Sequence, residues 1–226
     1  SLPLPEATPF QLPELPVSVE LGEISVARIH LDESLLGFAA TLNLQGDLKL
    51  AEGSLTTQLK VDRLDRPGDR LELTAGYANE NRQITLDLAL QEAAGGLIST
   101  ALALPAAPSL ELTVAGTGPV EDFTAQMALA SNGDQRLSGR VELTALSAPV
   151  QSAPPQGQTP ADADMGIGFS ADLGGDIDAL LLPDYRPFFG PDLKMTLRGS
   201  TTAEAGFVLD SFALRSQALR LTGALA

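Results

Sequence analysis

The residue types best suited to chemistry in this sequence are one histidine and a few acidic clusters. His30 lies within Arg28-Ile-His-Leu-Asp32. A metal site or a general base needs partner residues, and the sequence has no second histidine. Because lone histidines seldom form sites unaided, we interpret His30 as a residue on the surface of a strand.

The acidic clusters favour structural roles. The run Gly-Gly-Asp-Ile-Asp at 174–178 is similar to a calcium-binding repeat, but it occurs once, and Asp176 is better placed to cap a helix. Asp162 and Asp164 lie in a segment rich in Pro, Gln and Ala that cannot hold catalytic geometry. The sequence contains no Gly-x-Ser-x-Gly motif, P-loop or dinucleotide fingerprint. We therefore predict no catalytic residue, no metal site and no cofactor, and a protein that is not an enzyme.

Composition excludes several classes of partner. The formal net charge of −15 repels phosphate backbones, so we predict no binding to nucleic acid. Cysteine is absent, which excludes disulfides and cysteine zinc sites. Aromatic residues make up only 4% of the chain, and the apolar mass is Leu, Ala, Val and Ile. Such a composition suits many thin, similar layers better than one central core.

Membrane-spanning and targeting segments are not predicted. The longest uncharged stretch, 93–110, contains a Gly-Gly pair and two prolines, so we reject a transmembrane helix there. The N-terminus is rich in Pro and lacks the basic start of a signal peptide. Residues 219–226 stop within an expected strand, and we therefore expect the chain to be part of a longer protein.

Alternation with period two dominates the sequence. In 42–50, leucines at even positions alternate with Asn, Gln, Asp and Lys, and the same pattern recurs in later runs. Clusters of Gly, Asp, Asn and Pro separate these runs, as expected for short turns. The sequence therefore predicts an all-β protein, an elongated antiparallel meander with one apolar and one wet face.

Two short helices are expected to interrupt the strands. Residues 92–104 place apolar side chains at helical spacing before Pro105, and 176–182 start with a capping Asp and stop at Pro183. Each is followed by a Pro-containing loop and a strand of similar sequence, which indicates a repeat. The matching landmarks are Gly116 with Gly199 (199−116 = 83), Phe123 with Phe207 (207−123 = 84) and Gly139 with Gly223 (223−139 = 84).

The repeat divides the chain into four parts. Residues 1–16 form an extended Pro-rich lead-in, 17–145 a first β unit and 165–226 a second β unit that is truncated at its end. Between the units, 146–164 are rich in Pro, Gln, Ser and Ala and cannot bury an apolar face. We expect this insertion to be a long surface loop within one continuous sheet rather than a domain boundary.

Several motifs resemble the TamB branch of the AsmA-like family. They are 12–24 (Leu-Pro-Glu-Leu-Pro-Val-Ser-Val-Glu-Leu-Gly-Glu-Ile), the module from Leu35 to Leu48, the stretch Leu-Thr-Ala-Gly-Tyr-Ala-Asn at 73–79 and Gln-Glu-Ala-Ala-Gly-Gly-Leu-Ile-Ser at 91–99. Together they cover most of the chain from about residue 12 and depart from the family mainly in the insertion.

The resemblance implies a fold and a function. Members of this family are anchored in the inner membrane of Gram-negative bacteria and cross the periplasm as a β-taco, a long U-shaped sheet with an apolar groove. They support phospholipid transport to the outer membrane and, with an Omp85-type partner, outer-membrane protein assembly and secretion. This chain has neither the anchor nor the conserved C-terminal domain, so the resemblance makes it an internal part of the groove, and the partner interaction is not carried onto it.

Our hypothesis is that the aliphatic residues of the strands line a groove for phospholipid acyl chains. The proposed lining is Leu42, Leu44, Leu48, Leu59, Val61, Leu86, Leu88, Leu112, Val114, Met127, Leu129, Val141, Leu143, Met195 and Leu197. Packing of these residues against a second sheet remains open, as expected of an extracellular adhesin or scaffold with a filled core. An outer-membrane barrel also alternates apolar and polar residues, but it needs aromatic girdles that this sequence does not supply.

Overall fold

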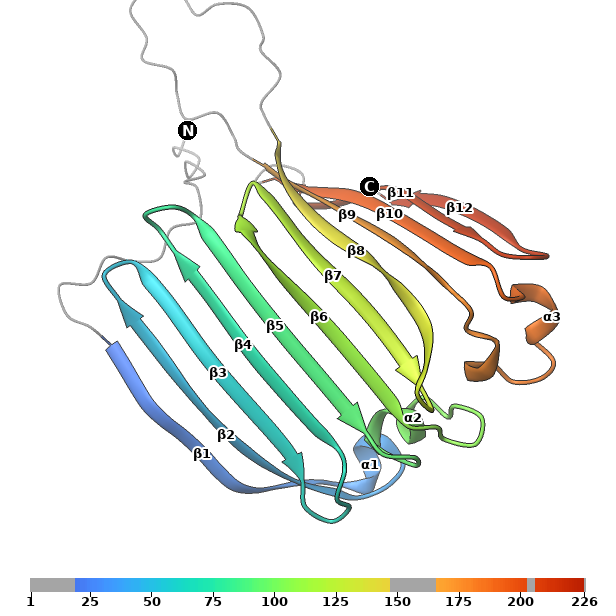
Figure 1. The fold of residues 1–226 in the computed structure, drawn as a ribbon, viewed down its shortest axis with the longest axis horizontal. Coiled ribbons are helices and arrows are strands. Elements are labelled where there is room, and N and C mark those ends of the chain that lie inside the picture. The colour runs from blue at the N-terminus through green and yellow to red at the C-terminus, as the bar shows by residue number, and fades with distance from the viewer. Residues whose placement is uncertain (1–18, 147–165, 203–205, 226) are drawn as a thin grey trace, which may run out of the picture.

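The computed structural model describes residues 19–146, 166–202 and 206–225, and these fold into one open sheet of twelve antiparallel strands. Each strand pairs with the strands that precede and follow it in sequence, so that β1 and β12 are the two edges (Figure 1). The prediction of an all-β, elongated and curved meander is confirmed. The strands are β1 (Val19–Leu31), β2 (Ala40–Ala51), β3 (Ser54–Arg63), β4 (Arg70–Ala78), β5 (Gln83–Glu92), β6 (Leu110–Pro119), β7 (Asp122–Ser131), β8 (Asp134–Leu146), β9 (Gly166–Gly175), β10 (Leu193–Thr202), β11 (Gly206–Arg215) and β12 (Arg220–Leu225).

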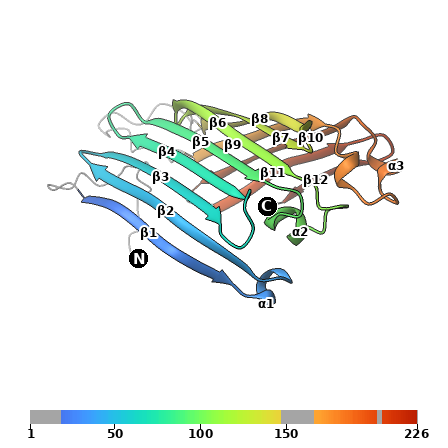
Figure 2. The same ribbon diagram turned by 60° about the horizontal axis from the view of Figure 1, so that its bottom comes forward.

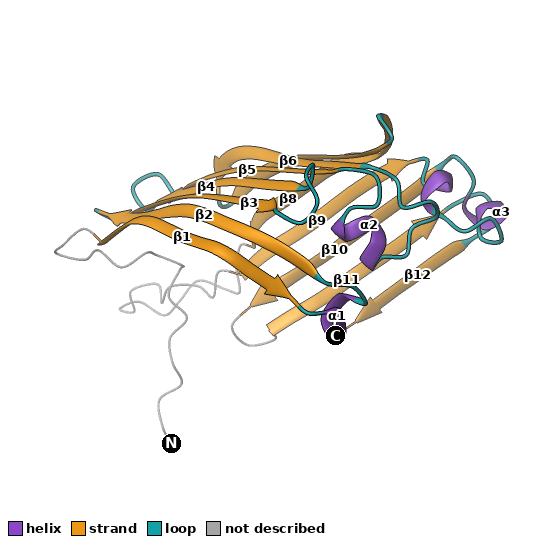
Figure 3. Cartoon of the chain, turned by 90° about the horizontal axis from the view of Figure 1, so that it is seen from below, coloured by secondary structure: helices purple, strands orange, loops and turns teal. Residues whose placement is uncertain are grey.

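The sheet is continuous but not flat. Strand β8 pairs with β9 from Leu137 opposite Gly175 to Leu146 opposite Gly166, so the insertion joins two adjacent strands of the same sheet. Past β8 the sheet turns back, and β9–β12 lie below the first half of the sheet in Figure 3. The predictions for 1–16 and for nearly all of 146–164 fall outside the described residues.

Short helices gather at one end of the strands (Figures 2 and 3). They lie in the β1–β2, β5–β6 and β9–β10 loops, so a helical loop recurs every four strands. The helices are α1 (Glu33–Leu36), α2 (Leu97–Ala101), the 3-10 helix η1 (Asp178–Leu180) and α3 (Arg186–Phe189). Tight turns join β2 to β3 and β4 to β5 at the opposite end of the strands.

The helices differ from the sequence expectation in extent and number. Helix α2 is much shorter than 92–104, because Glu92 still pairs with Leu110 in the sheet and Ala103 adopts a positive φ of 50°. In 176–182 only η1 forms, and the side chain of Asp176 accepts a hydrogen bond from the Asp178 amide. Helices α1 and α3 were not predicted, because four residues are too few to show a helical period.

The strand after each helical loop carries the same pattern of inward residues. Ala40, Leu110 and Leu193 begin β2, β6 and β10, and all three are buried. Six residues later come Gly46, Gly116 and Gly199, separated by 70 (116−46) and 83 (199−116) residues. The repeat therefore has a third copy, which includes β2 and which the two-copy alignment of the sequence did not contain.

These three glycines permit a close approach of neighbouring strands. A Cβ at Gly46, Gly116 or Gly199 would overlap the carbonyl oxygen of Gln58, Thr124 or Val208, respectively, on the next strand. All three would-be Cβ atoms point to the apolar side of the sheet, so the backbone is crowded on that side. Crowding on one face means that the sheet bends toward it, and glycine is the residue that allows the bend.

We predict that Gly116→Ala destabilises the fold by about 1–3 kcal/mol, because the added methyl group meets Thr124 O and approaches Ala125 Cα at 2.8 Å. The measurement is urea unfolding followed by circular dichroism. The matched control is Gly223→Ala, since a Cβ at Gly223 would have no atom within 4 Å. Equal stability of the two variants would contradict the role given to the repeated glycines.

Candidate functional site

The strand register brings the proposed lining residues together on one face. Leu44 lies opposite Val61, Val61 opposite Leu71, Leu71 opposite Leu90, and Leu90 opposite Leu112. Directly opposed residues of antiparallel strands share a face, and the same relation continues through every pair of strands. All fifteen residues of the sequence hypothesis therefore lie on this side, which we call the apolar face. That they contact lipid stays a prediction.

The apolar face is larger than the sequence hypothesis. Strands β1, β4, β9 and β11 contribute residues that were not proposed, such as Val26, Leu73, Leu173 and Leu214. Bulges between Leu21 and Ile24 and between Val26 and Ile29 hide the alternation in β1, and β11 has another bulge after Leu209. In β4 and β9 the alternation is regular and could have been found from the sequence.

The strands that turn back, β9–β12, do not seal the apolar face in the part of the chain that the structure describes. Each of the fifteen proposed residues is half-buried. The fully buried apolar residues of this part are few, namely Ala40, Leu110, Phe123, Ala125 and Leu193. A sandwich core would bury the inner residues of most strands, so the half-burial argues against a filled interior.

The apolar face reaches both edges of the sheet. Ile24 and Val26 on β1 are 37% and 40% exposed. Near the other edge, Phe207 on β11 and Leu221 on β12 are 64% and 51% exposed. Phe207 stacks on Phe169 with ring centroids 5.1 Å apart, across the position of Gly199. The face is thus a continuous strip that runs across all twelve strands.

Helix α2 lies over the apolar face at the end of the strands where the helical loops lie (Figure 3). Leu97 and Ile98 of α2 and four apolar strand residues line an open hollow of about 200 Å³, with Arg63, Asp69, Arg70, Gln91 and Glu92 around it. The four strand residues are Leu42, Val61, Leu71 and Leu90. We call this space the α2 hollow.

Hydrogen bonds from the sheet hold α2 in place. The Glu92 carboxylate oxygen Oε1 accepts from the Ser99 amide at 3.0 Å and from the Ser99 hydroxyl at 3.1 Å, and both residues are buried. Glu92 Oε2 is buried without a hydrogen-bond partner. In addition, Asp69 accepts from the amides of Ala93 and Leu97 at 3.1 Å.

Charged side chains in and next to the β3–β4 loop bind the neighbouring loops. Arg66 donates to the carbonyl oxygens of Ala94 and Gly95, each at 2.6 Å. The guanidinium of Arg63 pairs with Asp65 at 2.8 Å and with Asp69 at 3.1 Å. Its hydrogen bonds to Asp65 lower the pKa of that carboxyl to about 2. Asp65 also accepts from the Thr41 amide at 2.7 Å, which ties this loop to β2.

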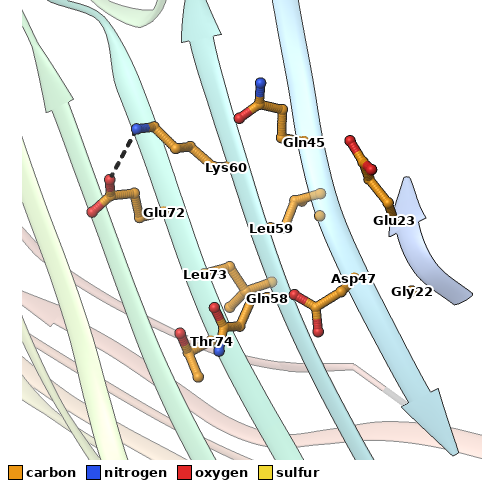
Figure 4. A pocket seen from close by; sticks show the side chains of 11 residues that line it. Gly22, Glu23, Gln45, Asp47, Gln58, Leu59, Lys60, Glu72, Leu73 and Thr74 are labelled. Carbon is orange, nitrogen blue, oxygen red and sulfur yellow. Dashed lines mark ion pairs between the residues drawn. The ribbon is translucent and has the colours of Figure 1, made fainter. Parts of the chain in front are cut away.

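The opposite face of the sheet is polar and wet. Over β1–β4 it carries a hollow of about 490 Å³ lined by Glu23, Gln45, Asp47, Gln58, Lys60, Glu72 and Thr74 (Figure 4). Lys60 and Glu72 form an ion pair of 3.9 Å there, with side chains 40% and 53% exposed. Such exposed pairs contribute little stability, and we interpret this face as a solvated surface.

Among the described residues, those singled out for chemistry do not assemble into a reactive site. His30 lies on the polar face of β1, where its Nδ1 is 3.2 Å from the hydroxyl of Thr41. Within the described residues, no group of three or more His, Cys, Asp or Glu side chains is placed to hold a metal ion. The same residues include no helix with the length and apolar character needed to cross a bilayer.

Comparison of the chain with protein-family models, with curated proteins and with solved structures finds no match. The geometry of the apolar face is therefore the basis for assigning a function.

We predict that Asp65→Asn lowers stability at pH 7 by up to about 1 kcal/mol, because the ion pair with the buried Arg63 is lost. The pKa of Asp65 is lower in the folded chain than its ordinary value near 3.8, so its contribution exists above that value. It disappears as the pH falls from about 4 through about 2.

The measurement is urea unfolding of both proteins at pH 7 and near pH 2. The difference in free energy of unfolding should be clearly smaller at the lower pH, where Asp65 is partly protonated in the folded chain. Glu80→Gln, at an exposed turn residue, is the control. An Asp65→Asn difference that stays constant between the two pH values would contradict the assignment.

Proposed function

We propose that this chain is a non-enzymatic conduit segment whose apolar face carries phospholipid acyl chains. The observation that supports the proposal is the apolar face itself, which is half-buried rather than sealed in the described part of the chain and continuous across twelve strands. Soluble proteins rarely expose contiguous apolar surface on this scale, and such a surface usually marks a binding site.

The energetics fit acyl chains as cargo. Exposing a lipid chain to water costs about 0.8 kcal/mol per CH₂, or roughly 20 kcal/mol or more for a diacyl lipid. A strip of aliphatic side chains removes much of this cost without gripping the headgroup. Leucine, valine and methionine lining, with few aromatic rings, presents a smooth surface along which a chain can slide.

The place of this conduit is also part of the proposal. The resemblance of the sequence motifs to the TamB branch of the AsmA-like family supports a periplasmic location, in a protein anchored in the inner membrane of a Gram-negative bacterium. In that setting the segment supports phospholipid transport between the two membranes and outer-membrane protein assembly and secretion. The Omp85-type partner would contact other parts of the protein.

An adhesin or scaffold with a filled core is the competing function. It predicts that the inward leucines are sealed from solvent, as in a sandwich. The half-burial of all fifteen proposed residues favours the conduit instead.

The test compares two arginine substitutions on β5. Leu88 lies on the apolar face opposite Leu73 and Val114, whereas Ala89 lies on the polar face opposite Glu72 and Thr113. We predict that the wild-type chain, expressed in a Gram-negative periplasm, carries phospholipid into native mass spectrometry. Leu88→Arg should lose the lipid, because it places an unpaired charge in the acyl path.

Ala89→Arg is the matched control and should retain the lipid, since it adds the same charge on the wet side. Circular dichroism and the melting temperature establish that both variants fold. Loss of lipid in both variants, or in neither, would overturn the conduit. A folded wild-type chain that binds no lipid would favour the filled-core scaffold.

A further inference from the structure

The α2 hollow combines features that the rest of the apolar face does not have. Strand residues form its floor and the apolar side chains of Leu97 and Ile98 form its roof. A lipid chain would therefore be covered on two sides here, by the strands and by α2.

The two cations that line the hollow, Arg63 and Arg70, are already paired with carboxylates. Arg63 bonds with Asp65 and Asp69, and Arg70 bonds with Asp62 at 2.8 Å. The oxygens of Asp69 are also used by two amides of the α2 loop. No cation of the wall is left to receive a phosphate, so burying a lipid headgroup in this hollow would be costly.

The size of the hollow fits part of one chain. The hollow has a volume of about 200 Å³, several times the roughly 30 Å³ that one water molecule occupies in the liquid. A methylene group is similar in size. The hollow therefore has room for part of one acyl chain and is too small for a whole lipid.

The loop that follows α2 is strained. Ala103, Ala106 and Ala107 have φ values of 50°, 60° and 39°, a region that residues with a Cβ seldom adopt. Gly95, with φ of 71°, precedes α2, and the unpartnered Glu92 Oε2 lies beneath it. Strain and an unpaired oxygen both weaken the closed arrangement, which allows the roof to yield to an entering chain.

We propose that the α2 hollow is a seat for the methyl end of one acyl chain. The inference rests on the proposed function, because it assumes that acyl chains reach the apolar face. It adds a location and an orientation for the acyl chain. The methyl end of the acyl chain points toward the end of the strands with the helical loops, where α2 stops it. The headgroup remains outside the hollow.

The test is photocrosslinking with two phospholipid probes and the 226-residue chain. One probe carries a diazirine near the methyl end of an acyl chain, and the other carries it near the carbonyl. Mass spectrometry of digested protein locates the adducts. The methyl-end probe should label residues of the α2 hollow, such as Ile98 and Leu42, and the carbonyl-end probe should label other parts of the apolar face.

Filling the hollow provides the decisive variant. Ile98→Trp should abolish labelling in the hollow by the methyl-end probe while labelling of distant strands, such as β7 and β8, persists. Leu102→Trp is the matched control, because Leu102 follows the same helix but is 65% exposed, and its labelling should equal that of the wild type. If Ile98→Trp melts early, the smaller Ile98→Phe takes its place.

Two other outcomes separate the inference from the proposed function. Methyl-end labelling spread evenly over the apolar face, and unchanged by Ile98→Trp, would overturn the seat and leave the conduit standing. Absence of adducts from the whole apolar face with both probes would overturn the seat and the conduit together.

Discussion

The interaction on which this structure depends is the antiparallel hydrogen-bond ladder that links each strand only to its neighbours in sequence. A sandwich gains stability from two sheets that seal each other's inner faces, but in the described part of this chain few apolar residues of the inner face are fully buried. Inward leucines such as Leu73 and Leu88 are half-buried, so each gains only part of the roughly 1.5–3 kcal/mol available on full burial. Cross-strand pairs such as Leu73 with Leu88 must therefore supply much of the stability.

The curvature of the sheet and its helical loops follow from a pattern repeated every four strands. Inward glycines at positions such as Gly116 let the backbone bend toward the apolar side, where any Cβ would meet the adjacent strand. Six positions before Gly116 lies the buried Leu110, which anchors the strand at the end where the helical loops lie. Arg66 and Asp69 of the β3–β4 loop then form hydrogen bonds with backbone groups of the β5–β6 loop and hold α2 at this end of the strands. The helical loops thus lie at one end of the strands, and the apolar face runs across all twelve strands.

Period-two alternation was sufficient to predict the strands and the shared face of residues such as Leu44, Val61 and Leu112. Antiparallel pairing makes the face of a residue depend only on its parity, wherever no bulge intervenes. The bulges of β1 do intervene, which is why Ile24 and Val26 were missed. The third repeat was missed because the glycines are spaced by 70 and then by 83 residues. The hollow under α2 could not be predicted, since it depends on side chains from four strands that only the fold brings together.

The most direct test of an uncovered apolar face is thiol accessibility, because the chain has no cysteine of its own. Single cysteines at Leu88, Val141 and Leu197 would report on the apolar face, with Ala89 and Arg140 as controls on the polar face. A small uncharged maleimide should modify all five in the folded, lipid-free chain, and phospholipid should then protect only the first three. Inward cysteines that react only after unfolding would contradict this account and indicate a filled core.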